Sequence, residues 1–562
     1  MNKHLTKSNK LNPVFINKAT MLSFCAAVVM SGFVQGAPDG SALLQENETL
    51  PTVVEIPDSE LPLPPEAPED IEQEPENAFK VLISDITFKG VTVFPVSTLD
   101  EQVSDELNIK HSFTSLKRIA AQISGLYQEA GYMMAQVYLP QQNLKNGKLQ
   151  ININEGLIGE INIEQQGKLK SFITEKHLIS LKGTVINSAI LERKTRLLSD
   201  LPANEVSIVF EPSLKEGYTD MIVTTTDVKA GLGYLSLDNH GNRYIGSTRL
   251  SGQYIFNNKL GYGEKISLNG VSSGAGYSNI SIKSQLPIGG NGLLLDSEIT
   301  FNQYQLGESF SALEAHGRSR SVSSALFYPL IRSLNKNINI RAQLKQQNFT
   351  DEVDSVNSST TKRLDSLNIK FSGDYAELFG DTTYWGLGLS TGYVDLDDSQ
   401  KSIDSYDTDG QYTLLTGNLE RLYRLNDKWS VHMSAALQIA AANLDSAVKM
   451  QLGGSSAVRA YPQGEASVDS GAIANIEFNY QKNDELVLGL FWDVGFGKEH
   501  QNELNTDTDN SKHISGVGLK FDWNLAENWR LKSSIAWRTG DKPESDTRDN
   551  KPRFWLQLVR YL

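Results

Sequence analysis

The sequence of 562 residues is almost free of cysteine, since Cys25 is the only one. A disulfide framework and a zinc site built on cysteine ligands are therefore excluded. The apolar run 21–33 is too short for a helix that spans the roughly 30 Å hydrocarbon core of a bilayer, and nothing after residue 36 approaches one. Positive charge is also scarce: 52 Lys and Arg stand against 67 Asp and Glu, which argues against a general nucleic-acid binder.

The first 36 residues have the organisation of a cleaved secretory signal. They contain four lysines and no acidic residue, and the apolar run 21–33 follows these lysines. The small residues Val34 and Gly36 fit the positions before a signal-peptidase site. We therefore predict that residues 1–36 are a signal peptide and that the mature chain is exported. An exported chain without a spanning helix is either soluble or crosses a membrane as a closed β-barrel.

Residues 37–78 have a composition that opposes packing. They contain twelve acidic residues, eight prolines and no basic residue. Such a segment is predicted to be an extended, self-repelling linker. Without the signal and this linker, 48 basic and 55 acidic residues remain, so the rest of the chain is nearly balanced in charge.

Two α+β units are predicted next, at residues 79–157 and 158–228. In the first unit, apolar residues recur with helical spacing over 116–127, and Gly131 stands where a helix C-cap is expected. The second unit is a looser copy, with its helix around residues 191–198. The strands predicted for the two units are residues 81–88, 133–139, 148–154, 158–163, 206–211 and 220–226.

Residues 229–562 change to short segments in which apolar and polar side chains alternate. Around Trp492, which falls on the apolar face, Phe491, Asp493 and Gly495 fall on the polar face. Segments of about ten residues with one apolar face, and aromatic residues towards their ends, are typical of transmembrane β-barrels. A soluble β-sandwich alternates too, but the export signal and the missing disulfides favour the barrel. The region has room for about 16 strands.

Three groups of residues carry a resemblance to a known family. The first group is Tyr127, Gly131, Tyr132, Pro140, Gln141, Glu155 and Gly156. The second group is Asp238, Asn239 and Gly241, and the third is Val458, Arg459, Ala460, Tyr461 and Pro462 with Phe491, Asp493 and Gly495. Together they resemble the outer-membrane transporters of two-partner secretion, the haemolysin-secretion/activation and filamentous-haemagglutinin-transporter family of the POTRA-barrel superfamily.

The resemblance covers residues 79–562 and implies a β-dominated fold. Two periplasmic α+β POTRA domains, 79–157 and 158–228, would precede a transmembrane antiparallel barrel at 229–562. Residues 458–462 look like the tip of a long loop folded into the pore. In the family the loop arginine meets a strand aspartate there, so we expect a bidentate pair between Arg459 and Asp493. The alternative is a surface arginine and an unrelated aspartate in the lumen.

The sequence departs from the family pattern at two positions. Ala460 stands where the family commonly has glycine, and alanine lacks the left-handed backbone freedom of glycine. Leu562 ends the chain where a terminal aromatic residue is usual. We therefore expect recognition by the barrel-assembly machinery to depend on Tyr561 or Phe554.

The resemblance implies an outer-membrane pore of a Gram-negative cell that secretes a partner exoprotein by two-partner (type Vb) secretion. The POTRA domains would capture the amino-terminal secretion domain of this exoprotein by β-augmentation at exposed strand edges. A plug segment is expected near residues 40–50. Further expected partners are outer-membrane lipid and, during biogenesis, the barrel-assembly machinery, but no nucleic acid. The alternatives are a barrel-assembly insertase and a passive porin.

No catalytic residue, cofactor or metal site is predicted, and we do not expect an enzyme. Residues 270–274 match a Gly-x-Ser-x-Gly elbow, but an elbow requires a strand-to-helix turn and another alternating segment follows here. The cluster Asp404, Asp407 and Asp409 lacks EF-hand spacing, the histidines are dispersed, and no Walker loop occurs. Without a nucleotide site, we expect folding of the exoprotein outside the cell to drive export.

Overall fold

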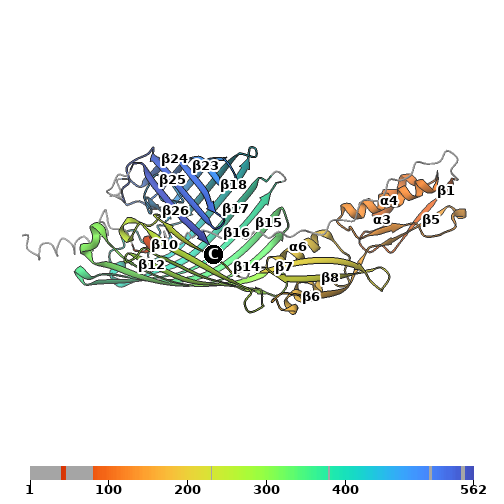
Figure 1. The fold of residues 1–562 in the computed structure, drawn as a ribbon, viewed down its shortest axis with the longest axis horizontal. Coiled ribbons are helices and arrows are strands. Elements are labelled where there is room, and N and C mark those ends of the chain that lie inside the picture. The colour runs from red at the N-terminus through yellow and green to blue at the C-terminus, as the bar shows by residue number, and fades with distance from the viewer. Residues whose placement is uncertain (1–39, 46–79, 229–230, 378–379, 505–508, 546–550) are drawn as a thin grey trace, which may run out of the picture.

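The computed structural model describes residues 40–45, 80–228, 231–377, 380–504, 509–545 and 551–562. Two α+β modules follow one another and lead into a closed β-barrel (Figure 1). The predicted signal peptide and most of the predicted linker lie outside the described residues. Among the helices that the structure describes, none is long and apolar enough to cross a membrane.

The first module has a three-stranded sheet in which β5 lies between β2 and β4. β2 and β5 run parallel, β4 and β5 run antiparallel, and β1 pairs separately with β3. Its elements are β1 Val81–Ile83, β2 Asp85–Lys89, α3 Val96–Val103, η1 Ser104–Glu106, β3 Ile109–His111, α4 Phe113–Glu129, β4 Gln136–Tyr138, η2 Leu144–Asn146 and β5 Lys148–Asn154.

Helix α4 carries the core of the first module. Its N-cap Ser112 accepts a hydrogen bond from the Ser115 N–H at 3.2 Å, and its buried residues recur at the helical period. Ile119, Ile123 and Tyr127 are at most 1% exposed. Full burial of such a side chain contributes roughly 1.5–3 kcal/mol. The amphipathic face that the sequence predicts therefore holds this helix on the sheet.

The first module also differs from the predicted elements. The strand predicted at 81–88 is split at Ser84, because the N–H groups of Ser84 and Asp85 both donate to the Gly147 carbonyl. The strand predicted at 133–139 is reduced to β4, and α3 and β3 go beyond the predicted elements.

The second module repeats the plan with a sheet of order β6-β8-β7, parallel between β6 and β8. Its elements are β6 Leu157–Gln165, α5 Ser171–Leu178, η3 Ile179–Leu181, α6 Ser188–Ser199, β7 Asn204–Pro212 and β8 Tyr218–Asp227. β6 begins one residue before the predicted second unit, so Leu157 belongs to this sheet.

The barrel consists of 16 antiparallel strands, as predicted, and β26 pairs with β9 to close it. The strands are β9 Gly231–Asp238, β10 Arg249–Asn257, β11 Lys265–Ser272, β12 Tyr277–Ile288, β13 Leu293–Gln305, β14 Ala315–Arg332, β15 Lys336–Val353, β16 Ser358–Ala376, β17 Thr382–Leu396, β18 Gly410–Arg424, β19 Trp429–Ala440, β22 Ser470–Gln481, β23 Leu486–Lys498, β24 Ser511–Ala526, β25 Trp529–Arg538 and β26 Arg553–Tyr561. The connections contain η4 Arg243–Ile245, η5 Glu308–Leu313, η6 Asp354–Val356, α7 Asp398–Lys401, η7 Ser446–Val448, β20 Met450–Gln451 and β21 Ser467–Val468.

The two faces of the barrel wall follow the predicted alternation. On β23, Leu490 and Trp492 point outward and are 58% and 50% exposed. Phe491 and Asp493 point inward and are 4% and 0% exposed. An apolar outer face and a polar inner face are what a barrel in lipid requires.

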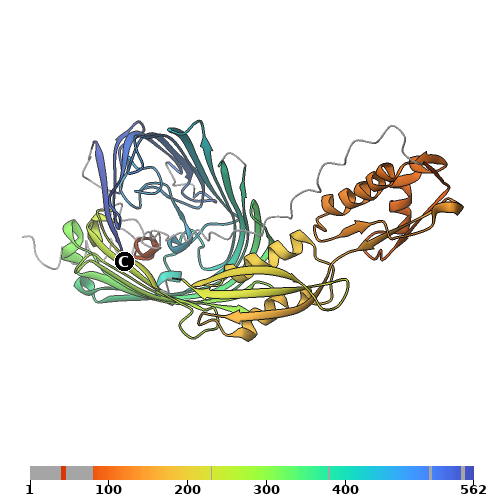
Figure 2. The same ribbon diagram turned by 45° about the vertical axis from the view of Figure 1, so that its right-hand side comes forward.

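The second module is fastened to one end of the barrel (Figures 1 and 2). Asp200 after α6 accepts two hydrogen bonds from the guanidinium of Arg332, at 2.6 and 2.7 Å. The Lys170 N–H donates to the Gly261 carbonyl in the turn between β10 and β11, at 2.9 Å. The first module extends away from the barrel beyond the second (Figure 2).

Candidate functional site

A long connection between β19 and β22, residues 441–469, folds into the barrel instead of extending away from it. It contains η7, β20 and β21, and its tip includes the predicted residues 458–462. Val458 and Tyr461 are fully buried, and Ala460 is 5% exposed. The tip packs against inward-pointing residues of the barrel wall.

Arg459 makes the bidentate contact with Asp493 that the resemblance implied. Its Nη2 lies 2.7 Å from one carboxylate oxygen of Asp493, and its Nε lies 2.9 Å from the other. The Arg459 backbone N–H donates to the same carboxylate at 3.1 Å. Asp493 is fully buried, so all these bonds form away from bulk water. Charge-assisted bonds of this geometry are among the strongest in proteins.

The Arg459 guanidinium has two further partners. Its Nη1 donates to Glu477 on β22 at 2.6 Å, and its carbon lies 3.5 Å from the centre of the Phe491 ring. Glu477 also accepts a hydrogen bond from Lys520. Glu477 is not among the site residues predicted from the sequence. Its signal was an acidic residue on the inward face of a strand, at the position that pairs with Phe491.

The loop tip also reaches the wall near the closing strand of the barrel. The indole N–H of Trp555 on β26 donates to the Arg459 carbonyl at 2.7 Å. The Tyr461 hydroxyl donates to the Asp541 carbonyl at 2.8 Å. Pro462 is buried, and its carbonyl accepts a hydrogen bond from the Glu465 N–H. The tip is therefore held from several strands at once.

Ala460 fits the loop without strain, contrary to the expectation from its lack of glycine-like freedom. Its φ is not positive, so the left-handed region is not required there. The methyl group of Ala460 instead packs against a glycine of the barrel wall, Gly516 on β24. A Cβ added to Gly516 would stand 2.4 Å from the Cβ of Ala460. Gly495 likewise leaves space for the loop, since its Cβ would stand 3.1 Å from Val458.

In the first module the predicted Tyr127 and Glu155 form one buried network. The Glu155 carboxylate accepts the Tyr127 hydroxyl at 2.7 Å, the Thr92 N–H at 2.8 Å and the Val93 N–H at 2.9 Å. Burial by itself would raise the pKa of Glu155, but hydrogen bonds from Thr92, Val93 and Tyr127 together lower it below its ordinary value. Burial, followed by the bond to Glu155, raises the pKa of Tyr127.

The other predicted residues of this module have distinct positions. Gly131 follows α4 with a φ of +87°, and Gly156 has a φ of +73°, a region that glycine adopts without strain. The Tyr132 ring lies edge-on to those of Phe94 and Tyr127. Pro140 and Gln141 follow β4, and Gln141 is exposed. The structure thus joins Tyr127, Tyr132 and Glu155 but leaves Gln141 outside the network.

The Asp-Asn-x-Gly group is not the tight hairpin turn that its composition suggests. The connection from β9 to β10 spans residues 239–248 and contains η4. Asp238 accepts a hydrogen bond from Arg249 at 2.9 Å, which closes the base of the connection. Gly241 packs against the Gly246 carbonyl, where a Cβ would stand 2.1 Å from the oxygen.

Asn239 extends the seam that closes the barrel. Its side-chain oxygen accepts the Leu556 N–H at 2.8 Å, and its side-chain NH₂ donates to the Phe554 carbonyl at 2.9 Å. Its backbone N–H also donates to the Leu556 carbonyl. The amide therefore continues the β9–β26 ladder beyond its last residue pair, at Asp238.

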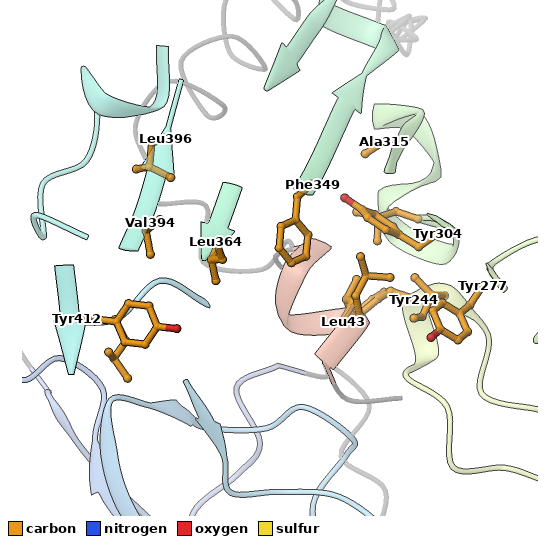
Figure 3. Close-up of a cluster of buried hydrophobic side chains, with 14 of the residues drawn as sticks. Leu43, Tyr244, Tyr277, Tyr304, Ala315, Phe349, Leu364, Val394, Leu396 and Tyr412 are labelled. Atoms are coloured by element: carbon orange, nitrogen blue, oxygen red, sulfur yellow. The ribbon is translucent and has the colours of Figure 1, made fainter. Parts of the chain in front are cut away.

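A short helix, α2 Gly40–Gln45, lies inside the barrel (Figure 2), within the segment 40–50 where a plug was predicted. Leu43 is fully buried, and Figure 3 shows it directed towards Phe349 and the tyrosines of the inner wall. Leu44 is 3% exposed and belongs to the same apolar cluster.

One lysine joins this helix, the long loop and the barrel wall. Lys362 on β16 places its Nζ 2.7 Å from the Ser41 hydroxyl of α2. The same Nζ lies 2.8 and 3.0 Å from the two oxygens of Asp445, which caps η7 in the loop. Ser41 also contacts Ser446 at 2.6 Å between hydroxyl oxygens. Both charged groups are at least nine-tenths buried.

The part of the chain that the structure describes contains no group of three or more His, Cys, Asp or Glu residues able to hold a metal ion. Residues 270–274 comprise the last three residues of β11 and the start of its turn into β12, so this Gly-x-Ser-x-Gly match leads into a strand and not into a helix.

Two α+β modules, a closed 16-strand barrel and a loop pinned inside it define a POTRA-barrel protein of the outer membrane. Residues 81–156 match the family model of the POTRA domain, ShlB-type. Residues 217–521 match the haemolysin secretion/activation protein family ShlB/FhaC/HecB. Since this second match covers more than half of the chain, the chain belongs to that family.

Known proteins agree with this assignment. The chain is 27% identical to the heme/hemopexin transporter protein HuxB of Haemophilus influenzae strain 86-028NP, over 80% of this chain and 81% of HuxB. It is 22% identical to the outer membrane transporter CdiB of Dickeya dadantii strain 3937, over 68% and 69%. The solved structure of CdiB from Escherichia coli has the same fold, with a TM-score of 0.72 at 17% identity, over 99% of this chain and 100% of that chain.

The protein is therefore an outer-membrane pore with a periplasmic POTRA region, and it secretes a partner exoprotein by two-partner secretion. The predicted family, fold class, location and function are confirmed. The insertase and porin alternatives are set aside.

Loss of the Asp493 charge should loosen the loop. Asp493→Asn leaves Arg459 buried with Glu477 as its remaining carboxylate, and breaking a buried pair in this way costs about 3–5 kcal/mol. We expect a lower urea midpoint for barrel unfolding and a larger single-channel conductance. Asp522→Asn is the matched control, since Asp522 makes a bidentate pair with the more exposed Arg530 and should cost at most about 1 kcal/mol. Equal effects of the two substitutions would contradict the role of Asp493.

The Glu155 network should make the first module sensitive to acid. Because the pKa of Glu155 is lowered on folding, its contribution is present above the ordinary carboxyl pKa and is lost as the pH falls through the lowered value. Glu155→Gln should cost roughly 1.5–3 kcal/mol at neutral pH and flatten this dependence. Hydrogen exchange of the α4 amides in the full-length protein, followed against pH, measures both effects. Glu160→Gln, at an exposed carboxylate, should behave like the wild type.

Proposed function

We propose that the resting pore is closed by two lumenal elements, the loop 441–469 and helix α2. Both elements move out of their resting positions in the lumen when the exoprotein enters. The observation that carries this proposal is the Lys362 contact. One buried ammonium binds Asp445 of the loop and Ser41 of the helix, so neither moves without affecting the other. Two closures coupled at one residue suit a channel that opens as a unit.

The Arg459 network is the second fastening. It lies between the loop tip and two neighbouring strands, β22 and β23, through Glu477 and Asp493. When the two charged groups separate, water that enters the lumen hydrates each of them. The free-energy cost of separating the pair is therefore smaller in a lumen that water can enter than in a dry protein core. Such a link holds the loop at rest and still permits release.

Capture of the exoprotein is assigned to the edges of the two small sheets. β2 and β4 are the edge strands of the first module, and β6 and β7 are those of the second. An added strand gains main-chain hydrogen bonds with little demand on its sequence, which suits an unfolded cargo. Tyr138 on β4 and Val209 on β7 are 47% and 52% exposed and mark two of these edges.

No catalytic step is assigned to the protein. The Gly-x-Ser-x-Gly match lacks the strand-to-helix turn of a nucleophile elbow. The energy for export is assigned to folding of the exoprotein outside the cell. During biogenesis, Tyr561 or Phe554 of the closing strand is assigned to recognition by the barrel-assembly machinery, and the apolar outer face is assigned to membrane lipid.

The plug role of α2 is tested by conductance. Leu43→Asp places a charge in an apolar seat where the leucine is fully buried, and an uncompensated charge there is strongly unfavourable. We expect the helix to leave its seat and single-channel conductance in planar bilayers to rise severalfold. Ala42→Asp adds the same charge at a half-buried neighbour and should change conductance little. A Leu43→Asp channel with wild-type conductance would refute the plug role.

Capture by the sheet edges is tested by disulfide cross-linking. The mature chain has no cysteine if Cys25 is removed with the signal, so single-cysteine variants are clean probes. Tyr138→Cys and Val209→Cys are each combined with a cysteine scan of the exoprotein's secretion domain. We expect cross-links at every second cargo residue from at least one edge, because alternate residues of a strand share a face.

Ile190→Cys is the control for this scan, because Ile190 is equally exposed, at 53%, but lies on helix α6. It should give no two-residue periodicity. Capture at the edges fails as a proposal if both edge probes lack periodic cross-links while the exoprotein is still exported.

A further inference from the structure

The outward face of β14 carries two arginines that the secretion mechanism does not use. Arg318 and Arg320 alternate with buried inward residues and are both exposed. Within the part of the chain that the structure describes, neither guanidinium has a hydrogen-bond or ion-pair partner. Two unpaired positive charges on the outer wall of a barrel require an explanation, because exposure of a charge to lipid is costly.

The arginines stand directly above the apolar belt. The next outward residues along β14 are Val322, 56% exposed, Ser324 and Leu326, 49% exposed. The same change occurs on the neighbouring strands. Outward residues above the boundary are Gln303 on β13, Asn348 and Thr350 on β15, and Thr361 and Arg363 on β16. Outward apolar residues on the neighbouring strands are Phe301, which pairs with Arg320, and Ile299 on β13, Leu344 on β15 and Leu367 on β16.

This boundary is at the cell-surface end of the barrel. The other end of β14 is Arg332, which binds Asp200 of the second module on the periplasmic side. Arg318 and Arg320 lie near the opposite end of that strand of 18 residues. The outward direction is set by the inner face, since Lys362 reaches helix α2 in the lumen and the adjacent Arg363 must therefore point out.

The strand register gathers the three arginines into one patch. Arg320 pairs with Asn348, and Asn348 pairs with Arg363 on the next strand. Neighbouring strands lie about 4.8 Å apart, and alternate residues of one strand about 7 Å apart. The backbone positions of Arg320 and Arg363 are therefore about 10 Å apart, with Asn348 between them, and those of Arg318 and Arg363 are about 12 Å apart.

The carboxylates near this patch have partners of their own. Asp365 binds Arg363 at 2.9 Å and also accepts a hydrogen bond from Gln346. Asp395 binds Lys401 at 3.1 Å, and Glu352 lies 3.5 Å from His316. The charge of Arg363 is thus partly balanced, whereas Arg318 and Arg320 leave the patch net positive.

We propose that Arg318, Arg320 and Arg363 bind the phosphate groups of lipopolysaccharide. The outer leaflet of a Gram-negative outer membrane consists of this phosphorylated glycolipid, and its phosphates lie at the boundary between acyl chains and sugars. Guanidinium groups bind phosphate oxygens through paired N–H donors. Val322 and Leu344 lie below the arginines, at the level of the acyl chains, and Asn348 and Thr350 offer polar groups to the sugars. The proposal rests on the outer-membrane location and not on the gating of the pore.

The proposal is tested by lipid binding to the full-length protein in detergent. Native mass spectrometry measures the bound fraction after addition of lipid A that carries both phosphates. We expect the double variant Arg318→Gln/Arg320→Gln to bind at least fivefold less than the wild type. The control Lys428→Gln/Lys482→Gln removes the same charge from exposed periplasmic turns and should bind like the wild type. Heat-modifiable migration on gels verifies that each barrel is folded.

Binding of other lipids, measured in the same way, distinguishes a site for lipopolysaccharide from a general anion site. Lipid A with a single phosphate should bind less than the diphosphorylated form, and phosphatidylglycerol should bind little. Undiminished lipid A binding by the arginine variant would overturn the proposal. So would equal binding of phosphatidylglycerol, because the patch would then be a general anion surface. Exoprotein export in the same cells is a separate readout: it reports on the gating proposal and should be retained by the arginine variant.

Discussion

A barrel in lipid must satisfy every backbone N–H and C=O within its own wall, and the rest of this structure depends on that constraint. Sixteen strands meet it by closing β26 on β9, with the Asn239 side chain extending the seam. Closure also fixes the two faces of each strand, since successive side chains point in opposite directions. The apolar residues face lipid, so the polar ones line a lumen. An open lumen of this size would be a leak, so the chain has to fill it.

The filling is held by buried charge pairs as well as by apolar packing. Arg459, Glu477 and Asp493 fasten the loop tip at one place, and Lys362 with Asp445 fastens its base and helix α2 at another. Each buried charge has a partner, which keeps the desolvation cost from becoming prohibitive. A packed apolar core would hold the same elements more permanently. Apolar packing adds to these contacts, since Val458 and Tyr461 of the loop tip belong to one buried cluster, and Leu43 of α2 and Leu444 of the loop belong to another.

The sequence predicts most of this architecture because alternation and helical spacing are local signals. The inward or outward direction of the Phe491, Trp492 and Asp493 side chains follows from the two-residue period of a strand. The buried face of α4 follows from the 3.6-residue period of a helix. The partners Glu477 and Lys362 could not be found in this way, because their contacts depend on strand register across the barrel. Ala460 shows the same limit: the glycine that accommodates the contact is Gly516, on another strand.

The longest strands carry functions on both of their faces. β14, β15 and β16 have 18, 18 and 19 residues and rise above the apolar belt. On β15, Phe349 contributes to the seat of α2 while its neighbour Asn348 faces outward between the arginines. On β16, Lys362 faces the lumen and Arg363 faces the membrane. Because a strand is stiff and a shift by one residue exchanges its faces, the register that seats the helix inside also sets the spacing of the arginines outside. The inner and outer surfaces of this wall are thus specified by a single set of backbone pairings.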